Sequence, residues 1–399
     1  MGMNIAIVGC GIGGLAAASL LCRSGHKVTI FERFPEPAPV GSGLVIQPVG
    51  QNVLSEIGVL DQAISLGARI DRMVGHEARS NRIVLDARYA IGNTNSFGLA
   101  IHRASLFSVL LDAAISHGVQ IETNAPVAGI TAPPRRKIML NGDRSFGPFD
   151  LIIDASGASS PLRPDFGKPL SYGAVWGNVN WSDALPFGQN ELRQRYLGAR
   201  NMLGILPIGT LPGSQIRQAA IFWSLPQRAH AGWAEKPLDD WKAEALSLWP
   251  DFHHCLEQIT DHGQMVMARY RHGTMKYPVA EELAYIGDAA HMASPQLGQG
   301  ANMALLDAHA LALAITNRQD ISEALALYAK ARRWHVWAYQ ALSAIFTPMY
   351  QSDSRILPMF RDRVLMPVSR IPPVPRILRR IVCGDMAHPY AGLGARQKR

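Results

Sequence analysis

The sequence has 399 residues, of which 48% are hydrophobic and 18% are charged. This composition is typical of a globular protein and excludes a disordered, collagen-like or coiled-coil chain. The four cysteines are scattered and no pair has CxxC spacing, so we expect no disulfide framework, dithiol redox centre or metal site. Because the chain has neither a basic leader nor a run of about 18 apolar residues, we expect a cytoplasmic protein.

The net charge of +8 is concentrated at the end of the chain. Residues 355–399 contain ten Lys or Arg and two Asp or Glu, while residues 1–354 contain 29 residues of each sign. A neutral main body without a nucleic-acid motif predicts no nucleic-acid partner. We interpret the basic tail first as a solvated face. Because residues 376–382 mix basic and apolar side chains, weak contact with an anionic membrane is the alternative.

The first part of the chain alternates strand-like and helix-like segments. Short apolar runs predict buried parallel strands, and the Ala- and Leu-rich or amphipathic segments between them predict helices. This alternation predicts a parallel, doubly wound sheet. The predicted strands cover residues 4–8, 28–31, 119–122 and 151–154, and the predicted helices cover residues 14–24 and 103–117.

The segment from Tyr172 to Tyr270 follows a different pattern. Aromatic and small residues alternate with a period of two, which predicts an antiparallel or mixed sheet. After this segment the chain returns to its first pattern, and prolines from Pro348 onward break up the tail. The predicted elements are strands over 216–223, 264–270 and 283–286, and helices over 238–249, 300–316 and 321–346.

A glycine-rich turn follows the first predicted strand. Residues 9–14 contain the pattern GxGxxG and lead into a predicted helix. Glycine allows backbone N–H groups to approach a pyrophosphate, and the helix N-terminus favours its negative charge. Glu32 ends the next strand, where a carboxylate can bind an adenosine ribose. The turn alone does not distinguish a nicotinamide from a flavin dinucleotide. The predicted cofactor-binding residues here are Gly9, Gly11, Ile12, Gly13, Gly14, Glu32 and Arg33.

A second glycine-bearing loop lies near residue 290 and favours the flavin. Residues 285–291 read Tyr-Ile-Gly-Asp-Ala-Ala-His, followed by Pro295 and by Gly-Gln-Gly at 298–300. Asp288 would end a strand, where open sheets bind hydroxyl groups. A helix beginning near Gly300 would direct its N-terminal N–H groups at a negative charge such as that of a reduced flavin. The two motifs together predict FAD.

With these motifs, the chain resembles the FAD-dependent aromatic hydroxylases typified by para-hydroxybenzoate hydroxylase over nearly its whole length. The resemblance implies that Glu32 holds the adenosine ribose, that Asp288 holds ribityl or ribose hydroxyls, and that Arg103 lies near the pyrophosphate. It also implies that the loop after Pro295 lines the flavin ring. The loop residues assigned in this way are Pro295, Gly298 and Gln299 at the reacting ring, with Gly300, Ala301 and Asn302 as further cofactor contacts.

The central motif departs from the family pattern. The family has Asp-x-x-x-Gly-Ala-Asp-Gly-x-x-Ser-x-x-Arg, which aligns with residues 150–163. Asp154 stands in place of the glycine, and Ser156 stands in place of the second aspartate. In the family that aspartate is associated with both FAD and the nicotinamide cofactor. The departure therefore leaves the choice between NADH and NADPH open, without affecting the prediction of FAD.

The resemblance implies a monooxygenase that uses NAD(P)H and O2 to hydroxylate an aromatic or heteroaromatic small molecule through a flavin C4a-hydroperoxide. The alternatives are a related FAD enzyme that epoxidises or reduces a prenyl- or polyketide-type substrate, and a flavin-binding protein without catalysis. No general base stands out among His102, His291, Tyr196 and Tyr270. The candidate substrate-pocket residues, each of which is also a plausible core residue, are Trp176, Tyr196, Phe222 and Trp223.

We expect the domains to be interleaved along the chain. The FAD-binding domain takes residues 1–70, 101–167 and 281–347, and the substrate domain takes residues 71–100 and 168–280. Residues 348–399 form a basic helical tail. The expected fold class is α/β: a Rossmann-like FAD-binding domain with a parallel sheet, a substrate domain with a mixed or antiparallel sheet, and a helical C-terminal region. A monomer or homodimer is expected.

Overall fold

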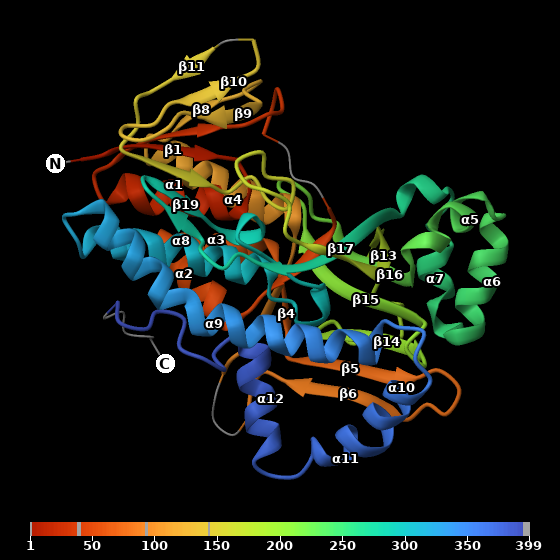
Figure 1. Cartoon of the computed structure of the whole chain (residues 1–399). Coiled ribbons are helices and arrows are strands. Elements are labelled where there is room, and N and C mark those ends of the chain that lie inside the picture. Colours follow the sequence, from red (N-terminus) through yellow and green to blue (C-terminus); the bar gives the residue numbers. More distant parts are fainter. Residues whose placement is uncertain (1, 38–40, 92–94, 143, 394–399) are drawn as a thin grey trace.

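The computed structural model describes residues 2–37, 41–91, 95–142 and 144–393. Its first layer is a six-stranded sheet in the order β18-β19-β12-β1-β2-β8, parallel except at the short edge strand β18 (Figure 1). This arrangement confirms the predicted doubly wound sheet. The strands are β1 (Asn4–Val8), β2 (Lys27–Phe31), β8 (Gln120–Glu122), β12 (Leu151–Asp154), β18 (Val279–Ala280) and β19 (Leu283–Tyr285).

Helices pack on this sheet and bury its apolar strands. Helix α1 contacts both α4 and α8, and it is apolar on nearly every side because sheet and helices enclose it. Gly13 allows this close packing, since a Cβ there would lie 3.2 Å from the Cβ of Ala304. The helices are α1 (Ile12–Arg23), α2 (Pro48–Ile57), α3 (Leu60–Leu66), α4 (Arg103–Ser116) and α8 (Gly300–Thr316).

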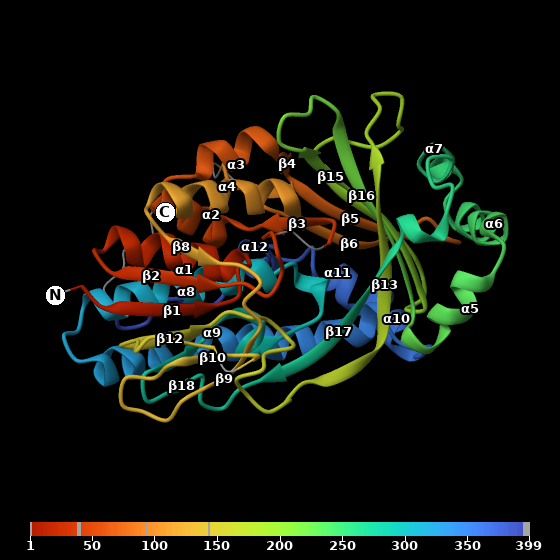
Figure 2. The same ribbon diagram turned by 90° about the horizontal axis from the view of Figure 1, so that it is seen from above.

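The second layer is an eight-stranded mixed sheet in the order β20-β17-β13-β16-β15-β14-β5-β6 (Figure 2). All neighbours are antiparallel except β14 and β5, so the predicted mixed sheet is confirmed. Helices α5 (His230–Glu235), α6 (Leu238–Leu248) and α7 (His253–Leu256) lie beside it. The strands are β5 (Arg72–Glu77), β6 (Ile83–Arg88), β13 (Lys168–Asn180), β14 (Glu191–Leu197), β15 (Asn201–Thr210), β16 (Arg217–Pro226), β17 (Val266–Thr274) and β20 (His291–Met292).

Two small sheets complete the strand content of the described residues. Strands β3 (Gly43–Ile46), β7 (Gly98–His102) and β4 (Ala68–Ile70) form one, and β9 (Val127–Ile130), β10 (Ile138–Leu140) and β11 (Ser145–Phe146) form the other. The boundary expected between residues 100 and 101 falls inside β7. The division into domains stays a prediction.

The long helix α9 (Ile321–Tyr350) runs past the end expected at residue 346 and contains Pro348. Side chains satisfy carbonyls in this last stretch, since Thr347 Oγ1 donates to Ser343 O and Ser352 Oγ donates to Pro348 O, each at 2.6 Å. Proline still removes one backbone hydrogen bond, the one that the carbonyl of Ala344 would accept. The expected break at Pro348 is corrected to a helix end two residues later.

The C-terminal segment folds back against β6 (Figure 1). A π-helical turn over Arg361–Leu365 joins α10 (Ile356–Phe360) to α11 (Met366–Val368), and α12 (Val374–Cys383) follows. The last six residues of the predicted tail, 394–399, lie outside the described residues. In the described part of the chain, no helix has the length and apolar character needed to cross a membrane.

Candidate active site

The glycine turn after β1 packs directly against the central motif. The φ of Gly9 is +101°, and a Cβ at this residue would lie 2.7 Å from the carbonyl oxygen of Ala155. A Cβ at Gly14 would lie 2.1 Å from the carbonyl oxygen of Gly9, so both positions require glycine for packing within the protein. Gly11 differs, because a Cβ there would meet no protein atom within 4 Å. The open space at Gly11 fits a cradle for a pyrophosphate.

Glu32 holds the shape of this turn. Its side chain is buried, with Oε2 accepting a hydrogen bond from the Cys10 N–H at 2.9 Å and Oε1 accepting one from the Phe34 N–H at 3.1 Å. The neighbouring Arg33 is exposed, and its guanidinium lies 4.6 Å from the centre of the Phe34 ring. Glu32 therefore lies beside the glycine turn, as expected of a ribose-binding carboxylate, although contact with a ribose stays a prediction.

Arg103 and Asp288 line one cavity from separate parts of the chain. Arg103 begins α4, and its backbone N–H donates to Ser42 O at 2.9 Å. Its guanidinium has no hydrogen-bond or ion-pair partner among the described residues. Arg103 and Asp288 both keep exposed surface, although protein atoms surround them closely. These surroundings lower the pKa of Arg103, an effect that the charge of Asp288 partly offsets. They raise the pKa of Asp288, while His291 and Arg103 oppose the rise. An unpaired guanidinium in a cavity is suited to a phosphate.

The loop after Asp288 forms the next part of the cavity wall. Pro295, Gly298, Gly300 and Ala301 line the cavity, and Gly298 has a left-handed φ of +61°. Contact of these four residues with the flavin stays a prediction. The loop leads into α8, whose N-terminal end lies at the same wall, as expected for a negatively charged group.

The side chains of Asn302 and Gln299, both predicted to contact the cofactor, form hydrogen bonds within the protein. Asn302 is fully buried; its Oδ1 accepts from Gln47 N at 2.8 Å, and its Nδ2 donates to Val45 O and Gly298 O at 3.0 and 2.9 Å. It ties β3 to the loop. The side chain of Gln299 is directed away from the cavity, because its buried Nε2 donates to the carbonyl oxygens of Ile381 and Val382 in α12 at 3.4 and 3.3 Å, and contact of Gln299 with the flavin ring stays a prediction. Both side chains hold the loop in place.

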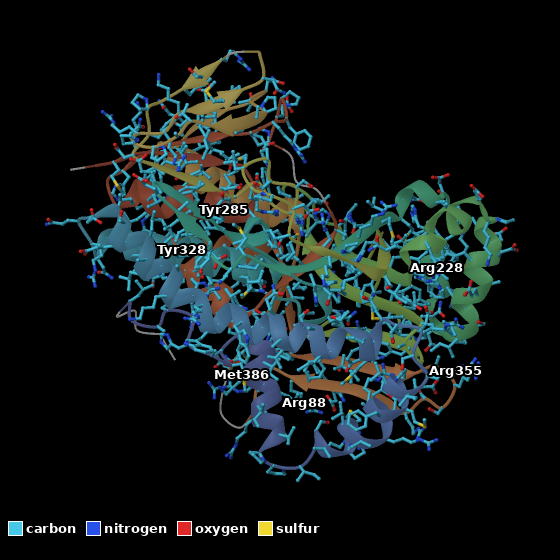
Figure 3. All side chains as sticks on the ribbon, in the orientation of Figure 1. Arg88, Arg228, Tyr285, Tyr328, Arg355 and Met386 are labelled. Atoms are coloured by element: carbon cyan, nitrogen blue, oxygen red, sulfur yellow. The ribbon has the colours of Figure 1, made fainter. Side chains whose placement is uncertain are left out.

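A buried network of charged side chains packs against the loop that follows Asp288. Asp307 accepts hydrogen bonds from Arg332 Nε at 2.7 Å, from the Gly287 N–H at 2.9 Å and from His291 Nε2 at 2.7 Å. Burial disfavours the charged form of Asp307, but His291 and Arg332 outweigh it and lower its pKa to about 2. His291 hydrogen-bonds to Asp307 and is not among the residues that line the cavity. Nearby, Tyr328 donates to the backbone oxygen of Tyr285 at 2.9 Å (Figure 3).

The unusual central motif turns its carboxylate inward. Asp154 is fully buried and accepts hydrogen bonds from Ser156 N at 3.0 Å, from Ser156 Oγ at 2.5 Å and from Ser160 Oγ. Burial raises the pKa of Asp154. Arg163 donates to Ala289 O at 2.6 Å and so joins this motif to the turn that carries Asp288. Asp154 therefore braces its own loop, and Arg163 positions the turn.

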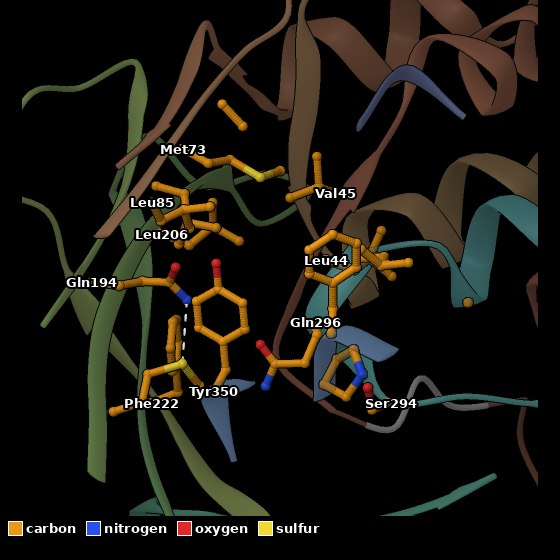
Figure 4. Close-up of a pocket in the computed structure, with 18 of the residues that line it drawn as sticks. Leu44, Val45, Met73, Leu85, Gln194, Leu206, Phe222, Ser294, Gln296 and Tyr350 are labelled. Carbon is orange, nitrogen blue, oxygen red and sulfur yellow. Dashed lines mark hydrogen bonds between the residues drawn. The ribbon is translucent and has the colours of Figure 1, made fainter. Parts of the chain in front are cut away.

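The cavity has a volume of about 800 Å³ and lies between the loop over residues 295–300, which we call the flavin loop, and the inner face of the eight-stranded sheet (Figure 4). Trp176, Tyr196 and Phe222 line it, and the rings of Trp176 and Phe222 are 4.5 Å apart. Trp223 does not line it. Because side chains alternate along a strand, Trp223 points to the other face and packs against Trp241 in the core beneath α5–α7. The expectation for Trp223 is corrected accordingly.

The remaining candidate bases are held in neutral forms. Burial raises the pKa of Tyr270 to about 12, and its hydroxyl accepts from Trp176 Nε1 at 3.0 Å. Burial also raises the pKa of Tyr196 well above its usual range, and its hydroxyl donates to Gln194 Oε1 at 2.7 Å. The Nδ1 atom of His102 accepts from Ala104 N at 3.0 Å, and burial lowers the pKa of its ring. Tyr196 and Tyr270 line the cavity, where their hydroxyls are suited to positioning a substrate, whereas His102 does not line it.

Part of the cavity wall was missed from the sequence. The C-terminal segment contributes an apolar stripe whose spacing of three to four residues is the signal that could have found it. The same stretch suggested a membrane-facing helix because its arginines lie between the apolar residues. The cavity-lining residues of this segment include Met366, Val368, Val374, Leu378, Ile381 and Val382.

Comparison with known proteins places this geometry in a family. A family model described as FAD binding domain matches residues 2–343. A relative named probable 2-heptyl-3-hydroxy-4(1H)-quinolone synthase, from Rhodococcus erythropolis, is 28% identical over 391 residues, covering 92% of each chain. An FAD-dependent urate hydroxylase from Klebsiella pneumoniae is 26% identical over 351 residues, covering 83% of this chain and 86% of its own.

Solved structures show the same fold. A 2-methyl-3-hydroxypyridine-5-carboxylic acid oxygenase superposes with a TM-score of 0.79 at 19% identity, covering 97% of this chain and 99% of its own. The HpxO protein of Klebsiella pneumoniae, complexed with FAD, superposes with a TM-score of 0.79 at 21% identity, covering 96% of this chain and 100% of its own.

Proposed function

The chain belongs to the FAD-binding domain family and is an FAD-dependent monooxygenase, and from that premise we propose how its site works and what it uses. We propose that NADH or NADPH reduces the bound FAD by transient contact, and that the enzyme then hydroxylates an aromatic or heteroaromatic ring with O2. The observation that carries this proposal is one cavity that joins Arg103 and Asp288 to the aromatic wall of Trp176 and Phe222.

The residues of the cavity fit the cofactor. Gly11 would let the pyrophosphate approach the backbone, Arg103 would neutralise its charge, and Asp288 would accept hydrogen bonds from hydroxyl groups of the cofactor. When bound, FAD supplies hydride acceptance and oxygen activation. The loop from Pro295 to Gly300 would orient the flavin ring toward the sheet. The apolar cavity lining would exclude water from the reacting atoms.

The test is a screen for substrate-stimulated reduction by the FAD-loaded protein. Phenols, hydroxypyridines and quinolones are added singly, and NADH or NADPH consumption, oxygen uptake and product mass are followed. We expect at least one ring compound to stimulate both consumption rates several-fold and to gain one oxygen atom. Turnover that needs no oxygen would instead support the reductase alternative, and no turnover with either reductant would support a binding protein.

For partners and location, we propose a cytoplasmic monomer or homodimer with weak affinity for anionic membranes. The supporting observation lies on the C-terminal segment, where Ile356 is 72% exposed and Ile371 is 58% exposed. Arg363 and Arg370 between them are also exposed and form no ion pair with another described residue. Apolar side chains together with unpaired arginines fit a surface of anionic headgroups.

The double substitution Arg363→Glu and Arg370→Glu should weaken binding to phosphatidylserine-containing vesicles by about tenfold or more, since each basic residue contributes about 1 kcal/mol. Co-sedimentation of the protein with the vesicles measures this loss. The control replaces two exposed basic residues that immediately precede strands β10 and β11, Lys137→Glu and Arg144→Glu. An equal loss in both double variants, or no binding by the unaltered protein, would contradict membrane contact through this segment.

A further inference from the structure

The cavity extends across the eight-stranded sheet well beyond the flavin loop. Its floor includes residues of seven consecutive strands, from β17 through β13, β16, β15, β14 and β5 to β6. Neighbouring strands are about 4.8 Å apart, so this floor covers roughly 29 Å along the curved sheet. Strand β20, which leads into the flavin loop, pairs only with β17. A ring held near the loop therefore leaves the β5–β6 end free for another part of the substrate.

This far end, which we call the tail arm, is apolar on both walls. Figure 4 shows Met73 and Leu85 along the sheet, with Leu44 and Val45 on the facing wall. The carboxylate of Asp86 in the same stretch is paired with Arg72 Nε at 2.7 Å. Helix α12 packs against β6 and closes the arm. The tail arm is defined by Met73, Leu85, Ala87, Val374, Leu378 and Val382.

The described residues provide the tail arm with no free cationic side chain. Among the described residues that line the cavity, the cationic side chains are Arg103, at the cofactor end, and Arg361. Arg361 donates from Nη1 to Met349 O at 2.9 Å and from Nε to Asp362 Oδ1 at 2.6 Å. Its guanidinium also lies 4.8 Å from the centre of the Tyr350 ring. A carboxylate on the substrate would find no unpaired partner in the arm and would lose its hydration there.

We propose that the substrate is an aromatic ring bearing an uncharged alkyl chain of several carbons, and that this chain lies in the tail arm. The proposal rests on the hydroxylase function and specifies the class of its substrate. The ring lies between the flavin loop and the wall of Trp176 and Phe222, where the Tyr270 side chain offers a hydrogen bond. The chain gains affinity by leaving water for the apolar walls.

The test measures binding without turnover. FAD-loaded protein is titrated with 4-quinolones that carry 2-alkyl chains of increasing length from methyl to nonyl, and the change in flavin absorbance gives Kd. We expect Kd to fall by about three- to fourfold for each methylene until the arm is filled, and a quinolone with a carboxylate at the chain end to bind more weakly than its alkyl counterpart. A Kd that is independent of chain length, or tightest binding of the carboxylate, would overturn the proposal.

A matched pair of variants on α12 locates the chain. Leu378→Trp narrows the tail arm, whereas Ile377→Trp changes the adjacent, exposed position, which does not line the cavity. The first variant should lose about tenfold or more in affinity for the heptyl compound and little for the methyl compound, while the second should resemble the unaltered protein. Equal losses for both compounds would place the chain elsewhere.

A second variant from the opposite wall keeps the test decisive if Leu378→Trp does not retain FAD. Ala87→Leu lies on β6 and should produce the same selective loss of affinity for the heptyl compound.

The binding and turnover experiments together distinguish the tail-arm proposal from the proposed function. If no quinolone perturbs the bound flavin and no ring compound stimulates NAD(P)H consumption, the proposed function fails. If ring compounds bind but chain length has no effect, the tail arm alone fails.

Discussion

Gly11→Val should weaken FAD binding strongly and leave the fold intact. The described residues place no atom within 4 Å of a Cβ at Gly11, so the protein itself has room for a side chain there. The branched side chain would instead fill the space through which a pyrophosphate approaches the backbone N–H groups. We expect the affinity for FAD to fall by on the order of 100-fold, equivalent to about 2.7 kcal/mol. Titration of the FAD-free protein with FAD measures the change.

The controls for this experiment separate cofactor binding from folding. The FAD-free forms of the variant and the unaltered protein should unfold at similar temperatures, and added FAD should raise Tm only for the unaltered protein. Gly129→Val changes a glycine that also has open space but lies in the β9–β10–β11 sheet, and it should bind FAD normally. Gly14→Ala should destabilise the fold itself, because its Cβ would lie 2.1 Å from Gly9 O. If the Gly11→Val protein binds FAD with unaltered affinity, the assignment of the pyrophosphate site to the backbone at Gly11 is wrong.

The glycine turn was predictable because local chemistry determines it. The sequence places glycine where a backbone needs positive φ at Gly9 and close approach at Gly14, and the hydrophobic periodicity places a strand before the turn and a helix after it. The mixed sheet was predictable for a similar reason, since alternation with a period of two is a property of each strand alone. Such features need no knowledge of distant contacts.

The roles of Gln299 and Trp223 depended on such distant contacts. Gln299 stands in a flavin-loop motif, yet its hydrogen bonds go to α12, about eighty residues away in the chain. Trp223 and Phe222 are adjacent aromatic residues, and only the packing of α5–α7 decides which of them faces the core beneath those helices. The tail arm was missed for the same reason: the apolar stripe of α12 suits a membrane as well as a protein cavity. The spacing of apolar residues predicts which face of a helix is apolar, but it does not predict whether protein, ligand or membrane contacts that face.

Of the proposed substitutions, Asp307→Asn should lower the free energy of unfolding the most. Asp307 and Arg332 are both nearly inaccessible to solvent, and removing the carboxylate charge leaves a buried guanidinium without its counter-ion. An amide also presents an N–H group where the carboxylate accepts hydrogen bonds from three donors. Breaking a buried pair in this way costs about 3–5 kcal/mol. Urea unfolding of the FAD-loaded protein, followed by tryptophan fluorescence, measures the loss. The exposed substitution Asp61→Asn should change stability by less than about 0.5 kcal/mol.

The acid limb of unfolding gives an independent check of the same residue. The pKa of Asp307 is lowered to about 2 in the folded protein from 3.8 in a free side chain, so its contribution is complete above about pH 4 and is lost as the pH falls toward 2. The shift corresponds to roughly 2 kcal/mol. The Asn variant should lack this step. Burial lowers the pKa of His335 to about 3 from 6.5, so both proteins should lose stability as the pH falls from 6.5 toward 3. Identical pH profiles below pH 4 would show that Asp307 does not carry the charge assigned to it.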